Sequence, residues 1–181
     1  GTDAVMLSAE TSIGKYPLEA VRMMARAARA AEDALLETHR DRTFAAADRT
    51  FADALGAAAA VAAESIGARC ILVFTASGYS AALIAQYRPR MPIHAFSGCA
   101  AVVAHLAVVW GVEARLLQPM PSGIEDLVHR CERALLESKQ LAPGDPIAIV
   151  AGVPLEEQGN TNFLKLHRVG EGLGRGAAPA R

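Results

Sequence analysis

Apolar stretches alternate with helical patterns along most of this chain, and the alternation predicts a mainly parallel β-sheet. Strand-like stretches lie at 70–74, 92–96, 112–117 and 146–151, and helical patterns at 51–66, 80–87, 99–110 and 124–140. Such βα units place parallel strands in one sheet with helices on both faces. A last stretch, 162–169, follows its predecessor after a short loop, which favours an antiparallel edge strand. Residues 51–169 are therefore expected to form a three-layer α/β/α domain with a five-stranded sheet.

The beginning of the chain does not fit into that domain. Residues 3–7 (DAVML) predict a strand buried on both faces, although no partner strand is near in the sequence. Pro17 suits the first turn of a helix, so residues 1–36 are interpreted as one strand and one helix of another domain. We expect a linker over 37–50 and a disordered tail over 170–181, and the missing initial Met predicts a fragment or a processed chain.

Composition and charge exclude several functional classes. The net charge of −1 provides no general attraction to nucleic acid or to anionic membranes. No apolar run reaches the roughly 18–20 residues that a membrane span requires. The three cysteines, Cys70, Cys99 and Cys131, lack the spacing of a metal site. Free thiols without a secretory signal favour a cytoplasmic location, with neither nucleic acid nor a membrane as partner.

The clearest candidate site follows the strand predicted at 70–74, where the chain reads TASGYS. Thr75, Ser77 and Ser80 supply hydroxyl groups, and Gly78 allows backbone N–H groups to approach an anion closely. A strand end that leads into a helix N-terminus is where open α/β sheets bind phosphate. The alternative is that Ser77 merely caps the helix. The local residues leave both readings open, and no Walker A motif is present.

Two other polar segments are weaker candidates. The loop that follows residue 151 ends in Gly159, Asn160, Thr161 and Asn162, which either close over a ligand or make an ordinary turn. Ser8 and Glu10 follow the opening apolar run, as polar groups do at the rim of a barrel. Because no base, nucleophile or metal ligand lies near them, capping explains them better. The residues alone thus indicate a module that binds a small molecule or a phosphate group.

The opening stretch GTDAVMLSAETSIGKYPLEAV resembles the end of the catalytic barrel of the pyruvate kinase family. The resemblance continues through TASGYSAALIAQYRPRMPI, the VWGV run, the PGD turn and the closing GNTN, in the order of the family. It covers about residues 1–169. It implies that residues 1–36 are the last strand and helix of a (β/α)8 barrel and that 51–169 are the C-terminal allosteric domain.

The resemblance also implies an activity for the intact enzyme. Members of the family transfer a phosphoryl group between phosphoenolpyruvate and ADP, need Mg²⁺ and K⁺, and are usually homotetramers. The catalytic lysine, threonine and acidic metal ligands lie on earlier barrel strands, so this chain alone is expected to be inactive and to bind no cofactor. Ser8 and Glu10 match the serine and glutamate that support the site at the barrel rim.

The resemblance finally implies a phosphorylated effector. The expected effector-binding residues are Thr75, Ser77, Gly78, Tyr79, Ser80, Gly159 and Asn160. Ala76 and Tyr79 stand where some members that bind sugar bisphosphates have basic residues, and this favours a monophosphate such as ribose 5-phosphate, glucose 6-phosphate or AMP. Two alternatives remain: a stand-alone regulatory module without an enzyme, and a domain that serves only tetramer assembly.

Overall fold

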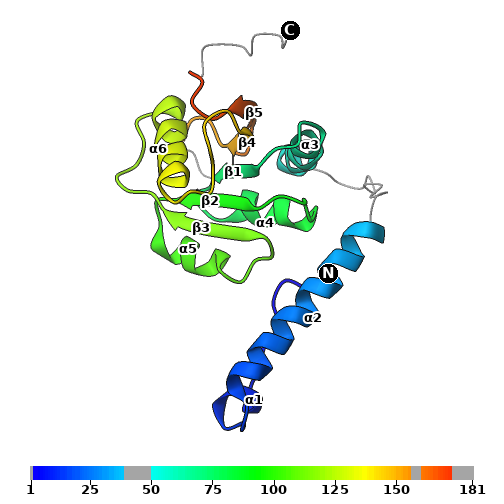
Figure 1. Ribbon diagram of the computed structural model, residues 1–181. Coiled ribbons are helices and arrows are strands. Elements are labelled where there is room, and N and C mark those ends of the chain that lie inside the picture. The colour runs from blue at the N-terminus through cyan, green and yellow to red at the C-terminus, as the bar shows by residue number, and fades with distance from the viewer. Residues whose placement is uncertain (1, 39–49, 156–159, 173–181) are drawn as a thin grey trace. The chain divides into compact units, whose positions relative to one another are not determined.

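The structure of the protein is a computed structural model that describes residues 2–38, 50–155 and 160–172 (Figure 1). The chain divides into two compact units, Gly1–Ala47 and Asp48–Arg181, and each is described here by itself. Most of the predicted linker at 37–50 and most of the predicted tail at 170–181 lie outside the described residues. Those two assignments therefore stay predictions.

The first unit is helical. It contains a single short turn, α1 (Ala9–Ser12), and a long helix, α2 (Pro17–Thr38), which begins at the proline as expected. The strand predicted at residues 3–7 is wrong, because residues 2–8 form no strand. A strand needs a neighbour to pair its backbone N–H and C=O groups, and the described residues of this unit contain no second strand. Apolar side chains such as Met6 and Leu18 are consequently exposed.

The second unit confirms the predicted three-layer domain. Its elements are α3 (Phe51–Ser65), β1 (Cys70–Phe74), α4 (Tyr79–Gln86), β2 (Ile93–Ser97), α5 (Ala100–Leu106), β3 (Val112–Leu116), α6 (Ile124–Glu137), β4 (Pro146–Ala151) and β5 (Phe163–Arg168). The strand order in the sheet is β3-β2-β1-β4-β5. All neighbours are parallel except β4 and β5, which are antiparallel at the edge.

Two apolar cores, one on each face, sandwich the sheet. Successive side chains of a strand point to opposite faces, so Leu72 of β1 and Ile149 of β4 pack with α6, whereas Val73 and Val150 pack on the other face. That other face is covered by α3, α4 and α5 through small and branched side chains. Because β1 and β4 are buried on both faces, they read in the sequence as continuous apolar runs.

Several helix ends differ from the predicted ones. Helix α5 ends at Leu106 rather than at residue 110, and α6 ends at Glu137 rather than at residue 140. Gly123 holds the N-cap position of α6, and no side chain caps it. The backbone N–H of Ser122 donates to the carboxylate of Asp126 over 2.9 Å. Apolar periodicity locates a helix well but fixes its ends poorly, since caps depend on side-chain geometry.

Candidate functional site

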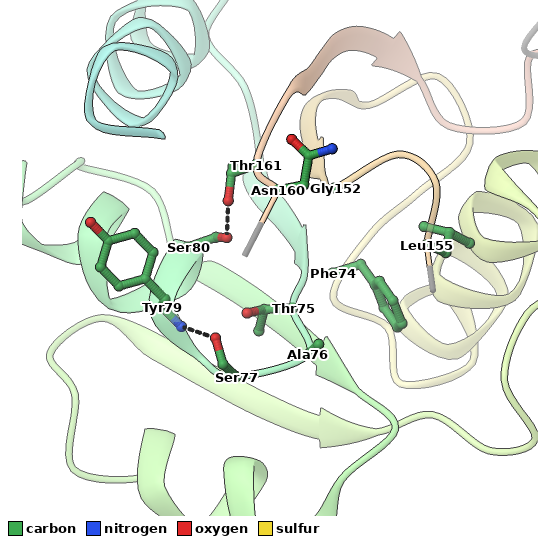
Figure 2. A pocket seen from close by; sticks show the side chains of 10 residues that line it. All are labelled: Phe74, Thr75, Ala76, Ser77, Tyr79, Ser80, Gly152, Leu155, Asn160 and Thr161. Carbon is green, nitrogen blue, oxygen red and sulfur yellow. Dashed lines mark hydrogen bonds between the residues drawn. The ribbon is translucent and has the colours of Figure 1, made fainter. Parts of the chain in front are cut away.

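The candidate site lies where the direction of the chain reverses in the sheet. The connections from β1 to β2 and from β2 to β3 run over one face, while α6 returns on the other face to β4. The loops after β1 and β4 therefore diverge and leave a crevice at the carboxyl ends of these strands, the usual ligand position in open α/β folds. A pocket occupies it (Figure 2), lined by Phe74, Thr75, Ala76, Ser77, Tyr79, Ser80, Gly152, Leu155, Asn160 and Thr161. The sequence placed candidate residues in the loops after β1 and β4, and both loops line this pocket.

The loop between β1 and α4 is held by Thr75. This threonine is buried, and its hydroxyl oxygen accepts the backbone N–H of Gly78 over 2.9 Å. Gly78 has a φ of +89°, in the left-handed region that favours glycine. An added Cβ would also lie 3.4 Å from the side chains of Val102 and Leu106. Thr75 and Gly78 therefore shape the loop, and neither has to contact a ligand in order to do so.

The N-terminus of α4 leaves backbone donors without partners. Ser77 was a candidate for the cap, but its hydroxyl accepts only a long bond of 3.4 Å from the N–H of Tyr79. The N-cap residue is Gly78, which has no side chain to cap with. Within the described part of the chain, the N–H groups of Ser80 and Ala81 have no acceptor. These donors, at the positive end of the helix dipole, suit an anion.

The loop after β4 forms the opposite wall of the pocket. Gly152 lies directly against the backbone of Asn160, since an added Cβ would be 2.0 Å from the Asn160 carbonyl oxygen. The Asn162 side chain ties the loop together: it accepts the N–H of Val153 over 2.8 Å and donates to the Val153 carbonyl over 2.7 Å. Gly159, which the sequence suggested as a site residue, lies outside the described residues.

One long-range contact joins the two walls. The hydroxyl oxygens of Ser80 and Thr161 are 2.6 Å apart, and each residue is only 7% exposed (Figure 2). The sequence placed Thr161 in a segment that either closes over a ligand or makes an ordinary turn, and it did not predict this bond. No local signal could reveal it, because the two residues are 81 positions apart.

The described residues that line the pocket supply hydroxyl and amide groups, and not one of them is Lys, Arg, Asp or Glu. Tyr79 is 51% exposed, so its aromatic ring is available to solvent. Hydroxyl and amide donors without a cation can hold one phosphate group, but they give weaker attraction for a second.

The other predicted rim residues belong to the first unit. Ser8 occupies the N-cap position of α1, and its N–H donates to the Glu10 carboxylate over 3.0 Å. Hydrogen bonds from the backbone N–H groups of Glu10 and Ser8 lower the pKa of that carboxyl. Local capping accounts for both residues as they stand here, and their supporting role at a barrel rim stays a prediction.

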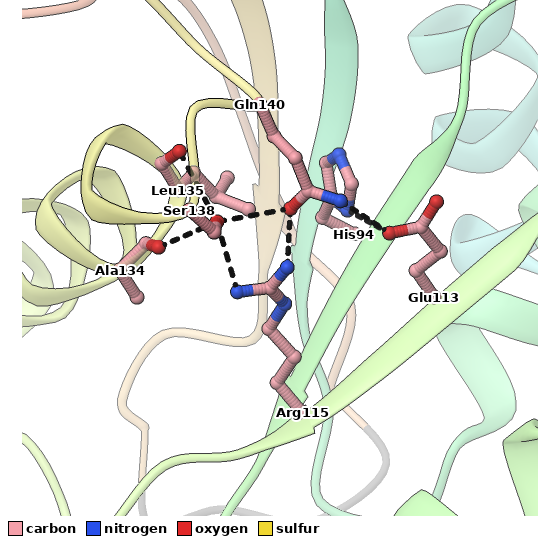
Figure 3. A network of polar contacts seen from close by, with 7 residues as sticks. All are labelled: His94, Glu113, Arg115, Ala134, Leu135, Ser138 and Gln140. Atoms are coloured by element: carbon pink, nitrogen blue, oxygen red, sulfur yellow. Dashed lines mark hydrogen bonds and ion pairs between the residues drawn. The ribbon is translucent and has the colours of Figure 1, made fainter.

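A second polar network, none of whose residues lines the pocket, ties the edge strand β3 to the segment after α6 (Figure 3). Gln140 donates to the Glu113 carboxylate over 2.7 Å, and Arg115 donates to Ser138 over 3.2 Å and also to Gln140. His94, almost fully buried, has its Nδ1 3.5 Å from Glu113 Oε2. Burial lowers the pKa of His94, against the smaller opposing effect of Glu113. These contacts give the charged side chains of Glu113 and Arg115 on β3 a structural role.

The described residues contain neither a cluster of metal ligands nor a helix able to span a membrane. Among the described residues, no three His, Cys, Asp or Glu side chains converge as metal ligands would. In the same residues, no helix combines the length and the apolar character needed to cross a membrane. Cys70 and Cys131 are buried in the core, and Cys99 is exposed.

Comparison with known proteins agrees with this fold. Residues 53–167 match the family described as pyruvate kinase, alpha/beta domain. The chain is 37% identical over 187 residues to the pyruvate kinase of Geobacillus stearothermophilus, covering 98% of this chain and 31% of that protein. It is 36% identical over 175 residues to the pyruvate kinase of Mycobacterium tuberculosis, covering 94% of this chain and 35% of the relative.

A solved structure extends the match to three dimensions. A crystal structure of a pyruvate kinase from Cryptosporidium parvum superimposes with a TM-score of 0.76 at 26% identity, and the match covers 93% of this chain and 34% of that one. The chain thus spans about a third of the length of the relatives that it matches. Sequence, fold and strand order lead to one conclusion: the chain belongs to the pyruvate kinase family, and residues 53–167 correspond to its alpha/beta domain.

Proposed function

We propose that residues 51–169 are the effector-binding regulatory domain of a pyruvate kinase, and that the pocket between β1 and β4 binds the phosphate group of the effector. One observation carries this proposal: among the described residues, the N–H groups of Ser80 and Ala81 at the start of α4 have no acceptor. The hydroxyl groups of Thr75 and Ser77 lie in the same pocket. Together these N–H and O–H groups form an uncharged set of hydrogen-bond donors, and the oxygens of a phosphate ester would accept from them.

The uncharged pocket favours an effector with a single phosphate group. A charge-assisted hydrogen bond contributes roughly 1.5–3 kcal/mol, so each missing cation weakens the binding of a second phosphate. Ala76 and Tyr79 supply no charge there. Ribose 5-phosphate, glucose 6-phosphate and AMP are therefore proposed in preference to fructose 1,6-bisphosphate.

The intact enzyme would transfer a phosphoryl group between phosphoenolpyruvate and ADP, yielding pyruvate and ATP, in a cytoplasmic homotetramer to which this domain contributes. Phosphoryl transfer requires a metal ion and a positively charged side chain, which together stabilise the negative charge on the transferred group. Among the described residues, no three His, Cys, Asp or Glu side chains converge. As the family resemblance implies, Mg²⁺ and K⁺ would be held by earlier barrel strands of the intact enzyme. We therefore propose that the 181-residue chain alone is inactive, and Mg²⁺-dependent turnover by the purified chain would contradict this.

A calorimetric titration of the chain with the three monophosphates and with fructose 1,6-bisphosphate tests the proposal. We expect at least one monophosphate to bind more tightly than the bisphosphate. Ser77→Ala should weaken its binding about tenfold, the loss expected for a hydrogen bond to a charged group. Ser65→Ala, at the exposed end of α3, is the matched control and should bind like the wild type. Absence of heat with every ligand would contradict effector binding and leave a role in assembly alone.

A further inference from the structure

The bond between Ser80 and Thr161 determines where the Ser80 hydroxyl proton points. The two oxygens are 2.6 Å apart, and either can be the donor. If Ser80 donates to Thr161, its single proton is directed away from the pocket. If Thr161 donates to Ser80, the Ser80 proton is free for a ligand.

We propose that Thr161 is a positioning residue of the phosphate pocket: when a ligand binds, it donates to Ser80, and Ser80 in turn donates to the phosphate. The inference rests on the proposed function, because it assigns a role within the same site. Thr161 itself does not have to contact the ligand. In such a chain of hydrogen bonds, each bond polarises the next and strengthens it.

The loop holds Thr161 in place without help from a ligand. Its neighbour Asn162 is fixed by the two hydrogen bonds to Val153, of 2.8 Å and 2.7 Å. The N–H of Asn162 also donates to the Ala151 carbonyl, at the end of β4. On the other side, the Asn160 backbone lies against Gly152. The Thr161 hydroxyl is therefore presented to Ser80 by a loop tied at both sides.

The arrangement matters because no described residue of the pocket lining is a cation. With only neutral donors in the described lining, the orientation of each hydroxyl counts for a large share of the attraction for phosphate. Ser80 supplies two of these donors, its N–H at the start of α4 and its O–H. A partner that sets the O–H direction would therefore change affinity without adding a contact.

The test compares isosteric variants of the full chain. Ribose 5-phosphate, glucose 6-phosphate and AMP are titrated into the wild type by calorimetry, and the tightest of them is the probe for the variants. Thr161→Val keeps the shape and loses the hydroxyl, and we expect about fivefold weaker binding. Thr161→Ser keeps the hydroxyl and should restore the affinity to within twofold. Thr11→Val, the same change in the first unit, should leave binding unchanged.

A double-mutant cycle separates positioning from general damage to the loop. In the Ser80→Ala background, Thr161→Val should have no further effect on affinity, because the hydroxyl that it orients is gone. An equal fivefold loss in both backgrounds would overturn the inference, as would a Thr161→Val variant that binds like the wild type. Should Thr161→Val not fold, Thr161→Ala and Thr161→Ser supply the same comparison. If the wild type binds none of the three probes, the proposed function itself is contradicted. That result differs from failure of the inference about Thr161, in which the wild type binds a probe and the variants do not differ from it as expected.

Discussion

Replacing Gly152 by alanine should destabilise the loop that forms one wall of the pocket. The new Cβ would lie 2.0 Å from the carbonyl oxygen of Asn160, whereas ordinary contacts begin at 3.4 Å. The new Cβ is bonded directly to the backbone, and the Asn160 oxygen is part of the backbone. Neither atom can therefore move aside as the end of a flexible side chain could. Residues 147–151 of strand β4, directly before Gly152, are buried and cannot shift easily. The loop must yield by more than 1 Å.

Forcing an extra carbon into a packed site costs about 1–3 kcal/mol. For a domain of this size, each kcal/mol lowers the unfolding temperature by roughly 3–6 °C. Thermal unfolding followed by circular dichroism should therefore show a decrease of about 3–18 °C for Gly152→Ala. Gly172→Ala is the control, because a Cβ there meets nothing within 4 Å. Equal unfolding temperatures for the two variants would refute the close approach of the two backbones.

Three further predictions concern buried titratable groups. Glu132→Leu removes the 2.8 Å hydrogen bond to His167, and the unpaired imidazole should lower the free energy of unfolding by about 1–3 kcal/mol in urea titrations; unchanged stability would argue against the pair. Burial lowers the pKa of His94, so the unfolded chain takes up its proton more readily, and stability should decrease as the pH falls below about 6.5. His94→Phe should make that decrease less steep. Burial raises the pKa of Cys70 to about 12, so a thiol reagent at pH 8 should modify Cys99 rapidly and Cys70 only after unfolding.

The centre of the sheet was predictable because strands β1, β2 and β4 are buried on both faces. Runs such as 70–74 and 146–151 are apolar throughout, and only central parallel strands combine that pattern with helices before and after. The same reasoning was wrong for residues 3–7. An apolar run predicts burial against something, but a strand also needs a partner for its backbone, and the described residues of that unit supply none.

The site was predictable only in part. Parallel strands bring their carboxyl ends to one edge, so the loops containing Ser77 and Asn160 were expected to meet, and they do. The roles within the loops depend on long-range geometry instead. That the Thr75 hydroxyl holds Gly78, and that Thr161 reaches Ser80, follows from distances that no sequence pattern encodes.

The most direct measurement is a titration of the ¹⁵N-labelled chain with ribose 5-phosphate, glucose 6-phosphate and AMP, followed by amide chemical shifts. The account predicts that one of them shifts the Ser80 and Ala81 amides most, with a smaller change at Thr161. The amide of Ser65, at the far end of α3, should not move. Shifts that spare Ser80 and Ala81, or no saturable shifts with any of the three compounds, would contradict a phosphate site between β1 and β4.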